Sequence, residues 1–487
     1  MRGIETTKTK LRRQVFLAIA KLAYDGFDAS VLEELPHSII PGEKAQYRDS
    51  VETERWIVAE RARAALGLPL RGEKEPGVLR EGELTAENAA DYRAPYIDII
   101  TAACNACIEE RVFVTNACQG CLEQSCVSIC PKGAVSIQHG RSVIDESKCV
   151  KCGLCIKACN YGAILKLERP CAKACGVKAI STNDAGVAAI DRSKCVSCGM
   201  CLATCPFGAI VDSSQLFQVI SDILGDEPVY AAIAPSFEGQ FGNVTVGQMR
   251  TALKTLGFAE LVQVATGADE ATRLEAEEFT HLVPAHQPFL ATSCCPGWVG
   301  LIKQHYPDLE QYISATPSPM LITARAIKAK DPCSKVVFIG PCVAKKMEGA
   351  ANWPNGAVDY VLTFEELASM LQAKDIIVSA CEDADAADAP TADGIGFAVG
   401  GGVSRAVAAA IAAANPDAPV DMQRAEGLAE CRKLLDTARA RRVNGCLLEG
   451  MACPGGCVGG AGVILPTTKA ALMVAKRVRQ EQQKEQK

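Results

Sequence analysis

The sequence predicts a mixed α+β and α/β protein that is built from three parts. Residues 1–95 contain no cysteine, and residues 11–24 and 51–66 have the apolar spacing of helices. Residues 96–213 contain sixteen of the 25 cysteines, in closely spaced runs. In residues 214–487, short β-rich runs alternate with helical stretches, which is typical of an α/β domain. The strands of this last part are expected at residues 229–234, 261–265, 335–339 and 359–363.

Length and charge narrow the class of protein. At 487 residues the chain is long enough for about three domains. Its net charge of −6 gives no reason to expect a nucleic-acid partner. No apolar run reaches the ~20 residues that a membrane helix needs, so no membrane partner is expected. A chain of this size does not need disulfides to fold, and thiolates that receive metal must stay reduced, so we expect a cytoplasmic protein.

The N-terminal part has no assigned chemistry. Arg12 and Arg13 precede a short apolar run at residues 15–20, an arrangement similar to a twin-arginine export signal. The run ends at Lys21 with no small-residue cleavage site at the usual spacing, so an amphipathic helix is the simpler interpretation. Residues 67–82 contain several glycines and prolines and are expected to form a linker. A docking or dimerisation element is the role we consider for this part.

Three cysteine runs in the second part are typical of bacterial ferredoxins. In such a run, three closely spaced thiolates hold one 4Fe–4S cubane, and the fourth cysteine binds the neighbouring cubane. Structural zinc is the alternative, although zinc sites rarely use this crossed pattern. The same Gly-Ala pair follows the last cysteine of each run, as expected for an internal repeat. The first two clusters are expected on Cys118, Cys121, Cys126 with Cys159, and on Cys149, Cys152, Cys155 with Cys130.

A fourth half-repeat lacks its opening cysteine pair, since Leu165 and Glu168 stand where those cysteines are expected. A separate pair upstream can complete the set, so we expect four 4Fe–4S clusters in residues 96–213. The alternative is that the upstream pair is unligated or binds a different metal. The expected ligands are Cys175, Cys195, Cys198 and Cys201 for the third cluster, and Cys104, Cys107, Cys171 and Cys205 for the fourth.

Three cysteine motifs in the last part differ from the ferredoxin type. They are T-S-C-C-P-G-W at residues 292–298, G-P-C-V-A-K-K at residues 340–346 and E-G-M-A-C-P-G-G-C at residues 449–457. In this order they strongly resemble the catalytic domain of iron-only (FeFe) hydrogenases, over about residues 228–470. The resemblance implies a two-lobed domain with an H-cluster, which is a 4Fe–4S cubane joined to a diiron unit carrying CO, cyanide and an azadithiolate. The implied cubane ligands are Cys295, Cys342, Cys453 and the bridging Cys457.

The resemblance also implies residues that orient the diiron unit, because a unit with one covalent tether depends on the contacts around it. Lys345 and Ser236 match the two cyanide contacts, and Pro235 belongs to the same cofactor-binding segment. Met451 matches a thioether that packs on the diiron unit. Taken singly, these residues would be an ordinary surface lysine, a turn serine and a core methionine.

Cys294 matches a family thiol that binds no metal and carries protons to the diiron unit. An ordinary thiol pKa near 8.5 is expected for it. The alternatives for the rest of the implied proton path are a helix-surface glutamate and a polar turn. The arginine that ends the path in the family is absent, with His281 and Leu282 near that place. The path residues implied by the resemblance are Glu275, Glu278 and Ser314.

Two positions depart from the usual family pattern. Gly340 stands where methionine is common, and Met320 stands where glutamine is common. Both keep the site apolar but change its packing, so the chain resembles a divergent branch of the family, the group often labelled B. The remaining cysteines belong to no motif and are expected to be small buried hydrophobes. They are Cys333, Cys381, Cys431 and Cys446.

The resemblance implies the reversible oxidation of H2 to protons and electrons, with ferredoxin or flavodoxin as the electron carrier and the hydrogenase maturases as assembly partners. A hydrogenase-like iron–sulfur assembly factor is one alternative, but Cys294, Lys345 and Met451 favour an enzyme. An H2 sensor is another, although no PAS-like or signalling domain is evident. The glycines at residues 400–402 lack the spacing of a dinucleotide fingerprint, so no NAD or flavin domain is expected.

Overall fold

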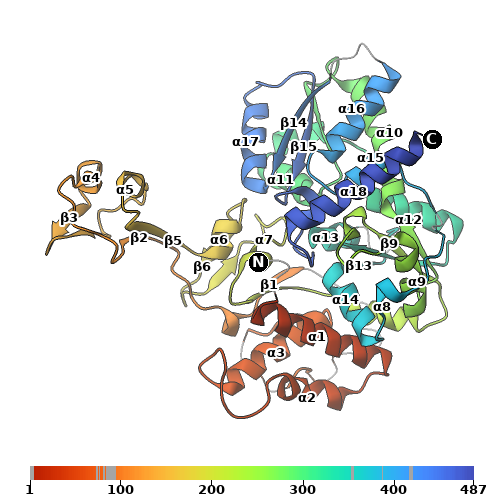
Figure 1. The fold of residues 1–487 in the computed structure, drawn as a ribbon, viewed down its shortest axis with the longest axis horizontal. Helices are drawn as coiled ribbons and strands as arrows, with labels where there is room; N and C mark the ends of the chain where they lie inside the picture. Colours follow the sequence, from red (N-terminus) through yellow and green to blue (C-terminus); the bar gives the residue numbers. More distant parts are fainter. Residues whose placement is uncertain are drawn as a thin grey trace.

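The computed structural model describes residues 5–72, 75, 77–80, 83, 95–351, 356–385, 388–415 and 420–486. The chain forms the predicted helical N-terminal segment, cysteine-rich module and two-lobed α/β domain (Figure 1). The predicted linker at residues 67–82 lies partly outside the described residues. Within the described part of the chain, no helix combines the length and the apolar character needed to span a bilayer.

The described part of the N-terminal segment contains three capped helices. They are α1 (Thr7–Tyr24), α2 (Ala29–Ile39) and α3 (Val51–Ala65). Each follows a polar residue whose side chain accepts a hydrogen bond from a first-turn amide, and these caps are Thr6, Asp28 and Ser50. The buried face of α1, with Val15 and Phe16, packs against α8 (Leu216–Ile223) and α14 (Phe364–Ala373). The segment therefore shares a core with the third part of the chain.

Short antiparallel strand pairs and one-turn helices form the cysteine-rich module. The pairs are β1 (Ile97–Ile99) with β8 (Ile210–Asp212), β2 (Glu110–Val114) with β5 (Ile164–Glu168), β3 (Val135–Gln138) with β4 (Arg141–Ile144), and β6 (Ile180–Thr182) with β7 (Ala188–Ile190). The helices are α4 (Ser125–Ser128), α5 (Leu154–Ala158), α6 (Pro170–Ala174) and α7 (Met200–Thr204). Figure 1 shows β3, α4 and α5 in a small lobe that projects from the body of the molecule, whereas α6 and α7 lie next to that body.

Two parallel sheets form the third part, one in each lobe. The first sheet has the order β10-β9-β12-β13 and consists of β9 (Val229–Ile233), β10 (Glu260–Gln263), β12 (Lys335–Gly340) and β13 (Tyr360–Thr363). The second has the order β11-β15-β14 and consists of β11 (Phe289–Ala291), β14 (Asp421–Glu426) and β15 (Cys446–Met451). Loops that follow the strands of both sheets meet between the lobes, where the cysteine motifs lie.

All four predicted strands belong to the first sheet, and the largest difference in their bounds is at residues 261–265. The predicted strand at residues 261–265 ends at Gln263, and Val264 begins the 19-residue helix α10 (Val264–Leu282). A β-branched residue favours a strand locally, but α10 packs against α12 (Pro319–Lys330) and α16 (Gly402–Ala414), and this packing prevails. The second sheet was not predicted, because β11 has only three residues and β15 runs into a cysteine motif.

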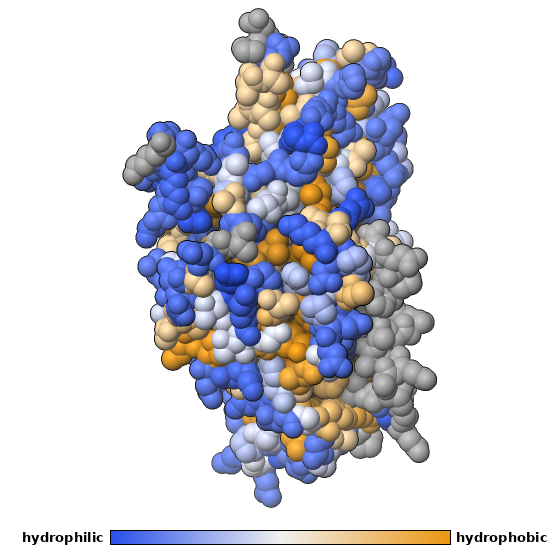
Figure 2. Space-filling view, turned by 90° about the vertical axis from the view of Figure 1, so that its right-hand side faces the viewer, coloured by the Kyte–Doolittle hydropathy of each residue, from blue (hydrophilic) through white to orange (hydrophobic). Residues whose placement is uncertain are grey.

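The remaining helices cover the two sheets. They are α9 (Val246–Leu256), α11 (Pro296–His305), α13 (Ala344–Ala350), α15 (Ala392–Gly396), α17 (Leu428–Arg439) and α18 (Thr467–Glu485). Figure 2 shows one face of the molecule, on which hydrophilic residues dominate and hydrophobic residues form separate patches.

Candidate active site

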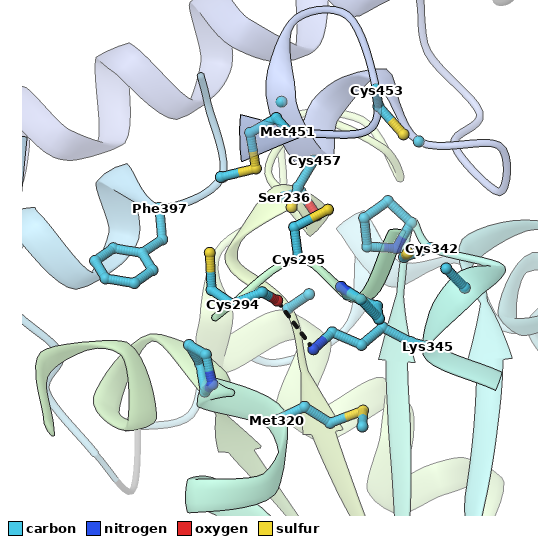
Figure 3. Close-up of a pocket in the computed structure, with 18 of the residues that line it drawn as sticks. Ser236, Cys294, Cys295, Met320, Cys342, Lys345, Phe397, Met451, Cys453 and Cys457 are labelled. Atoms are coloured by element: carbon cyan, nitrogen blue, oxygen red, sulfur yellow. Dashed lines mark hydrogen bonds between the residues drawn. The ribbon is translucent and has the colours of Figure 1, made fainter. Parts of the chain in front are cut away.

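The three cysteine motifs meet in one apolar pocket between the two lobes (Figure 3). Cys294 and Cys295 follow β11, and Cys342 follows β12. Cys453 and Cys457 follow β15, with Cys457 in the short helix η5 (Gly456–Gly459). Each therefore lies beyond the carboxyl end of a parallel strand, where open α/β sheets place their ligands. The fold brings together cysteines that are more than 150 positions apart in the sequence.

The four predicted cubane ligands are close enough to repel one another as thiolates. Burial raises the pKa of Cys342 to about 11 and that of Cys457 to about 12, and in both cases neighbouring thiols act in the same direction. Burial also raises the pKa of Cys453 well above its usual value, followed by the effects of Cys342 and Cys295. Four thiolates in one apolar pocket therefore need a strong positive counter-charge, which a cluster of iron ions supplies.

Glycine in the last motif allows the close approach that the pocket requires. Gly456 has a φ of +77°, and a Cβ atom there would lie 2.4 Å from the backbone nitrogen of Gly400. Any other residue would force apart the main chain next to Cys457.

Two polar side chains face this otherwise apolar pocket. Ser236, in the short helix η2 (Pro235–Phe237) after β9, is fully buried, and its Oγ has no hydrogen-bond partner among the described residues. Lys345 in α13 donates from Nζ to the Cys294 carbonyl at 3.3 Å and to Glu348 Oε2 at 2.6 Å. An unpartnered buried hydroxyl and a buried ammonium suit a bound group that carries hydrogen-bond acceptors.

Apolar side chains complete the lining of the pocket. Met451 is buried at the end of β15, and Pro235 and Phe397 also line the space. The two departures from the family pattern are explained by packing. A Cβ atom on Gly340 would lie 2.6 Å from the Phe338 ring, so the ring occupies space that a side chain at residue 340 would need. Met320 is buried in the lining at the start of α12, and it brings no amide donor there.

The predicted proton-path residues form two hydrogen-bonded groups, which Ser293 and Thr316 join. The buried Glu275 carboxylate accepts from the Ser293 backbone N–H at 3.0 Å and from the Ser293 hydroxyl at 3.2 Å. Ser314 Oγ donates to Glu278 Oε2 at 2.5 Å, and the Ala315 N–H donates to the same carboxylate at 2.9 Å. Both glutamates belong to α10, one turn apart, so the path runs from the buried Glu275 toward the half-exposed Glu278.

Sequence reasoning missed two polar residues that join the path. Ser293 connects Glu275 to the Thr316 carbonyl, to which its hydroxyl donates at 2.5 Å. Thr316 also contacts Glu278 Oε2 at 3.4 Å. Ser293 could have been found from its place beside Cys294 in the first motif. Thr316 carries no sequence signal, because it reaches the path only through the fold of the loop before α12.

The expectation of an ordinary pKa for Cys294 is wrong. The pKa of this thiol is raised well above its usual value, first by burial and then by the nearby Glu275, Cys295 and Glu449. Burial disfavours the thiolate, and neighbouring negative charges add to the effect. Cys294 is therefore held as a neutral thiol that can donate a proton.

The two half-modules of residues 96–213 gather their cysteines in separate groups. Burial raises the pKa of Cys198 to about 12, and Cys175 and Cys195 act in the same direction. The pKa of Cys201 is raised first by burial and then by Cys198, Cys195 and Cys175. Cys198 also lines the pocket and interacts with Cys342 and Cys453, so this group adjoins the candidate active site.

A second group contains the upstream pair. Burial raises the pKa of Cys171 to about 11, and Cys205 and Cys104 raise it further. Burial raises the pKa of Cys107, and Cys104 and Cys205 act in the same direction. Cys104 and Cys107 thus lie beside Cys171 and Cys205, as the predicted fourth ligand set requires.

The projecting lobe holds the remaining cysteines. Burial raises the pKa of Cys155, with contributions from Cys149, Cys152 and Cys130, which together form the second predicted ligand set. Cys126 and Cys159 pack in the same small core as that set, while Cys118 and Cys121 lie in the same lobe. Within the described residues, no group of three or more His, Cys, Asp or Glu side chains could hold a single metal ion. The cluster ligand sets stay predictions.

Replacing Cys104 and Cys107 together by serine should lower the iron content by about four atoms per chain, because a cubane with only two thiolates is not retained. Iron analysis of the purified protein measures this loss. The matched control replaces Cys333 and Cys381, which belong to no predicted set, and should leave the iron content unchanged. An unaltered iron content in the Cys104 and Cys107 variant would contradict the fourth ligand set.

The cysteines outside the motifs only partly match their expected burial. Cys431 and Cys446 are buried, as expected. The prediction is wrong for Cys333, which is exposed, and for Cys381, which is half-buried. Both lie in segments that follow a helix, where the sequence pattern gave no sign of exposure.

Comparison with known proteins places the same regions in known families. Residues 227–461 match the family model described as iron only hydrogenase large subunit, C-terminal domain. Residues 117–163 match a 4Fe-4S dicluster domain, and residues 165–216 match an LdpA Fe-S cluster-binding domain.

Curated relatives match over a large part of the chain. Iron hydrogenase 1 of Clostridium pasteurianum is 31% identical over 278 residues, which cover 48% of this chain and 48% of the relative. The NADP-reducing hydrogenase subunit HndD of Solidesulfovibrio fructosivorans is 29% identical, with 65% and 56% covered. The periplasmic Fe hydrogenase large subunit of Nitratidesulfovibrio vulgaris is 29% identical, with 66% and 85% covered. The chain spans about half the length of the first two relatives.

Among solved structures, a variant of apo FeFe-hydrogenase HydA1 from Chlamydomonas reinhardtii is similar, with a TM-score of 0.45 and 21% sequence identity. The match covers 54% of this chain and 88% of that structure.

Proposed function

We propose that this chain, which is an iron-only hydrogenase-like protein, catalyses the reversible oxidation of H2 to two protons and two electrons. The observation that carries the proposal is the meeting of three features at one apolar pocket. These are four thiols that line the pocket, a hydrogen-bonded acid chain that leads outward, and a cysteine group of the iron–sulfur module. Proton transfer, electron transfer and substrate chemistry each need one of them.

The residues of the pocket fit an H-cluster. Cys295, Cys342, Cys453 and Cys457 would hold the cubane, and Cys457 would bridge it to the diiron unit. When bound, this group supplies the redox-active metal site at which H2 is split or formed. Ser236 Oγ, which has no protein partner, and Lys345 Nζ would donate hydrogen bonds to the cyanide ligands. Met451 and the apolar wall would exclude water, so that these donors act in a medium of low dielectric.

Proton transfer would begin at the neutral thiol of Cys294. Burial keeps this thiol protonated, and the carboxyl group of Glu275 lies nearby. Burial also raises the pKa of Glu275 to about 7, which matches the pH at which a relay carboxyl exchanges protons most readily. From there Ser314 and the half-exposed Glu278 would carry the proton to solvent. An exit at Glu278 explains how the path can work without the family's terminal arginine.

Electrons would leave through the cysteine group that contains Cys198, since this group adjoins Cys342 and Cys453. The projecting lobe would then pass them to a separate carrier. We propose ferredoxin or flavodoxin for this role, a cytoplasmic location, and the hydrogenase maturases as the source of the diiron unit. An iron–sulfur assembly factor has no use for the acid chain from Glu275 to Glu278, so the enzyme is the function that the geometry supports best.

Protein made together with the maturases should contain about 22 iron atoms, from five cubanes and one diiron unit. It should show CO and cyanide infrared bands and oxidise H2. Protein made without the maturases should keep about 20 iron atoms, lack the bands and be inactive. Metal analysis, infrared spectroscopy and an H2 uptake assay measure these outcomes. Activity in the absence of the bands would refute the proposed cofactor.

A further inference from the structure

Two basic side chains of the N-terminal segment lie against the main chain that carries Cys205. Lys8 Nζ, at the start of α1, donates to the carbonyls of Ala203 and Cys205 at 3.3 and 3.1 Å. Arg61 in α3 is 7% exposed and donates from Nη2 to the Gly208 carbonyl at 2.7 Å. Both therefore direct positive charge at the segment from residue 203 to residue 208. Figure 1 shows the N-terminus beside α7, which ends in this segment.

Two arginines hold the other side of the same cysteine group in the same manner. Arg48, in the loop between α2 and α3, donates from Nη2 to the Ala103 carbonyl, next to Cys104. Arg169, which is 2% exposed, donates to the Cys107 carbonyl from Nε at 3.1 Å and from Nη2 at 2.7 Å. Each contact is to a backbone carbonyl beside a predicted ligand. The group of Cys104, Cys107, Cys171 and Cys205 is thus surrounded by four cations, which are Lys8, Arg48, Arg61 and Arg169.

None of these four cations forms a salt bridge with an acidic residue of the described chain. Other buried cations nearby are paired, since Arg12 contacts Asp212 at 2.7 Å and Arg71 contacts Glu60 at 2.6 Å. Arg61 Nε, Arg48 Nε and Arg169 Nη1 are buried and find no hydrogen-bond partner among the described residues, which is also true of Nη1 of the paired Arg71. Burying a cation without a counter-ion is unfavourable, so an anion nearby would stabilise the buried Arg61 and Arg169.

The predicted fourth cluster is an anion of the required kind. Four thiolates outweigh the positive charge of a cubane core, and reduction adds one more negative charge. Lys8 Nζ and Arg61 Nη2 both donate to carbonyls of the segment that carries Cys205, so their positive charge lies near this predicted ligand. Nearby cations stabilise the reduced state of a cluster more than its oxidised state, and burial limits screening by salt.

We propose that helices α1 and α3 form an electrostatic cap, made of Lys8 and Arg61, which raises the reduction potential of the cluster on Cys104, Cys107, Cys171 and Cys205. The inference rests on the proposed function only through this ligand set. This cap gives the N-terminal segment a role other than docking. With a raised reduction potential, the cluster would hold electrons on their way between the projecting lobe and the active site.

The test is a redox titration of the clusters, followed by electron paramagnetic resonance, on full-length protein made without the maturases. Lys8→Met and Arg61→Met should each retain their iron and shift the midpoint of one cluster to lower potential. The expected shift corresponds to an about tenfold smaller ratio of reduced to oxidised cluster at a given potential, or about 59 mV for one electron. The variant that lacks Cys104 and Cys107 identifies the resonance signal of this cluster, because that signal should be absent from its spectrum.

Two control variants separate charge from packing. Arg61→Lys keeps the charge and should have a midpoint close to that of the parent. Lys10→Met removes an exposed charge from α1, the helix that also carries Lys8, and should leave the midpoint of every cluster unchanged. If Arg61→Met loses iron, the midpoint of Lys8→Met decides the test. Lys8 is half-exposed and donates its hydrogen bonds to backbone carbonyls, so its replacement should not disturb the packing of the cluster.

An unshifted midpoint in Lys8→Met, loss of the cluster in that variant, or an equal shift in Lys10→Met would each overturn the proposal. Since the titration does not depend on the diiron unit or on H2 turnover, a failure of the proposed enzyme activity would not affect its outcome.

Discussion

Replacing Cys294 by serine should leave the iron content and the infrared bands intact but lower H2 turnover by about 10²–10⁴-fold, the range typical of a lost proton-transfer group. The thiol lines the pocket, while its backbone carbonyl accepts a hydrogen bond from Lys345 that serine would preserve. A serine hydroxyl is a far weaker acid than a thiol, so it cannot pass the proton at a comparable free-energy cost.

The neighbouring residue provides the contrast for this experiment. Cys295→Ser should damage the cubane and therefore reduce both iron content and activity. Cys431→Ser, at a buried thiol that belongs to no predicted ligand set, controls for the loss of a sulfur atom. Near-parental turnover in Cys294→Ser would exclude the proton role. Loss of the cluster in that variant would mean that the roles of Cys294 and Cys295 are exchanged.

Replacing Glu275 by glutamine should also lower turnover by about 10²–10⁴-fold, because the amide cannot exchange a proton along the chain. Glutamine has nearly the same shape, and its carbonyl can still accept the hydrogen bonds from Ser293. Glu277→Gln is the matched control, since Glu277 lies two residues away on the exposed face of α10 and pairs with Arg273. H2 uptake rates, compared at equal diiron content from the infrared bands, measure the effect. Equal rates in both variants would remove Glu275 from the path.

The same variant has an expected effect on the pH dependence of stability. Burial raises the pKa of Glu275 to about 7, above the usual value for a glutamate. The folded state therefore holds this proton more tightly than the unfolded state, so the stabilisation is fully present below the unfolded pKa and is lost as the pH rises toward 7. Glu275→Gln should lose less thermal stability than the parent between pH 5 and pH 8. Melting temperatures across this range would test it, and identical pH profiles would contradict the assignment.

The sequence by itself determined the parts of the protein that depend on local spacing. The C-x2-C runs fix how nearby thiolates can surround one cluster, so the groups around Cys155 and Cys198 could be predicted without a fold. The four strands of the first sheet were predicted for a similar reason, since their apolar runs are continuous. The resemblance carried by the three cysteine motifs then indicated which thiols would share the pocket.

Only the tertiary structure decided the properties that depend on distant segments. The raised pKa of Cys294 follows from burial between the two lobes and from Glu275 and Glu449, which lie on other elements. The roles of Ser293 and Thr316 follow from the fold of two loops that meet at α10. The contact of Lys8 with the Cys205 carbonyl joins residues almost 200 positions apart. Desolvation and charge interactions depend on which surfaces pack together, and no local pattern in the sequence records that packing.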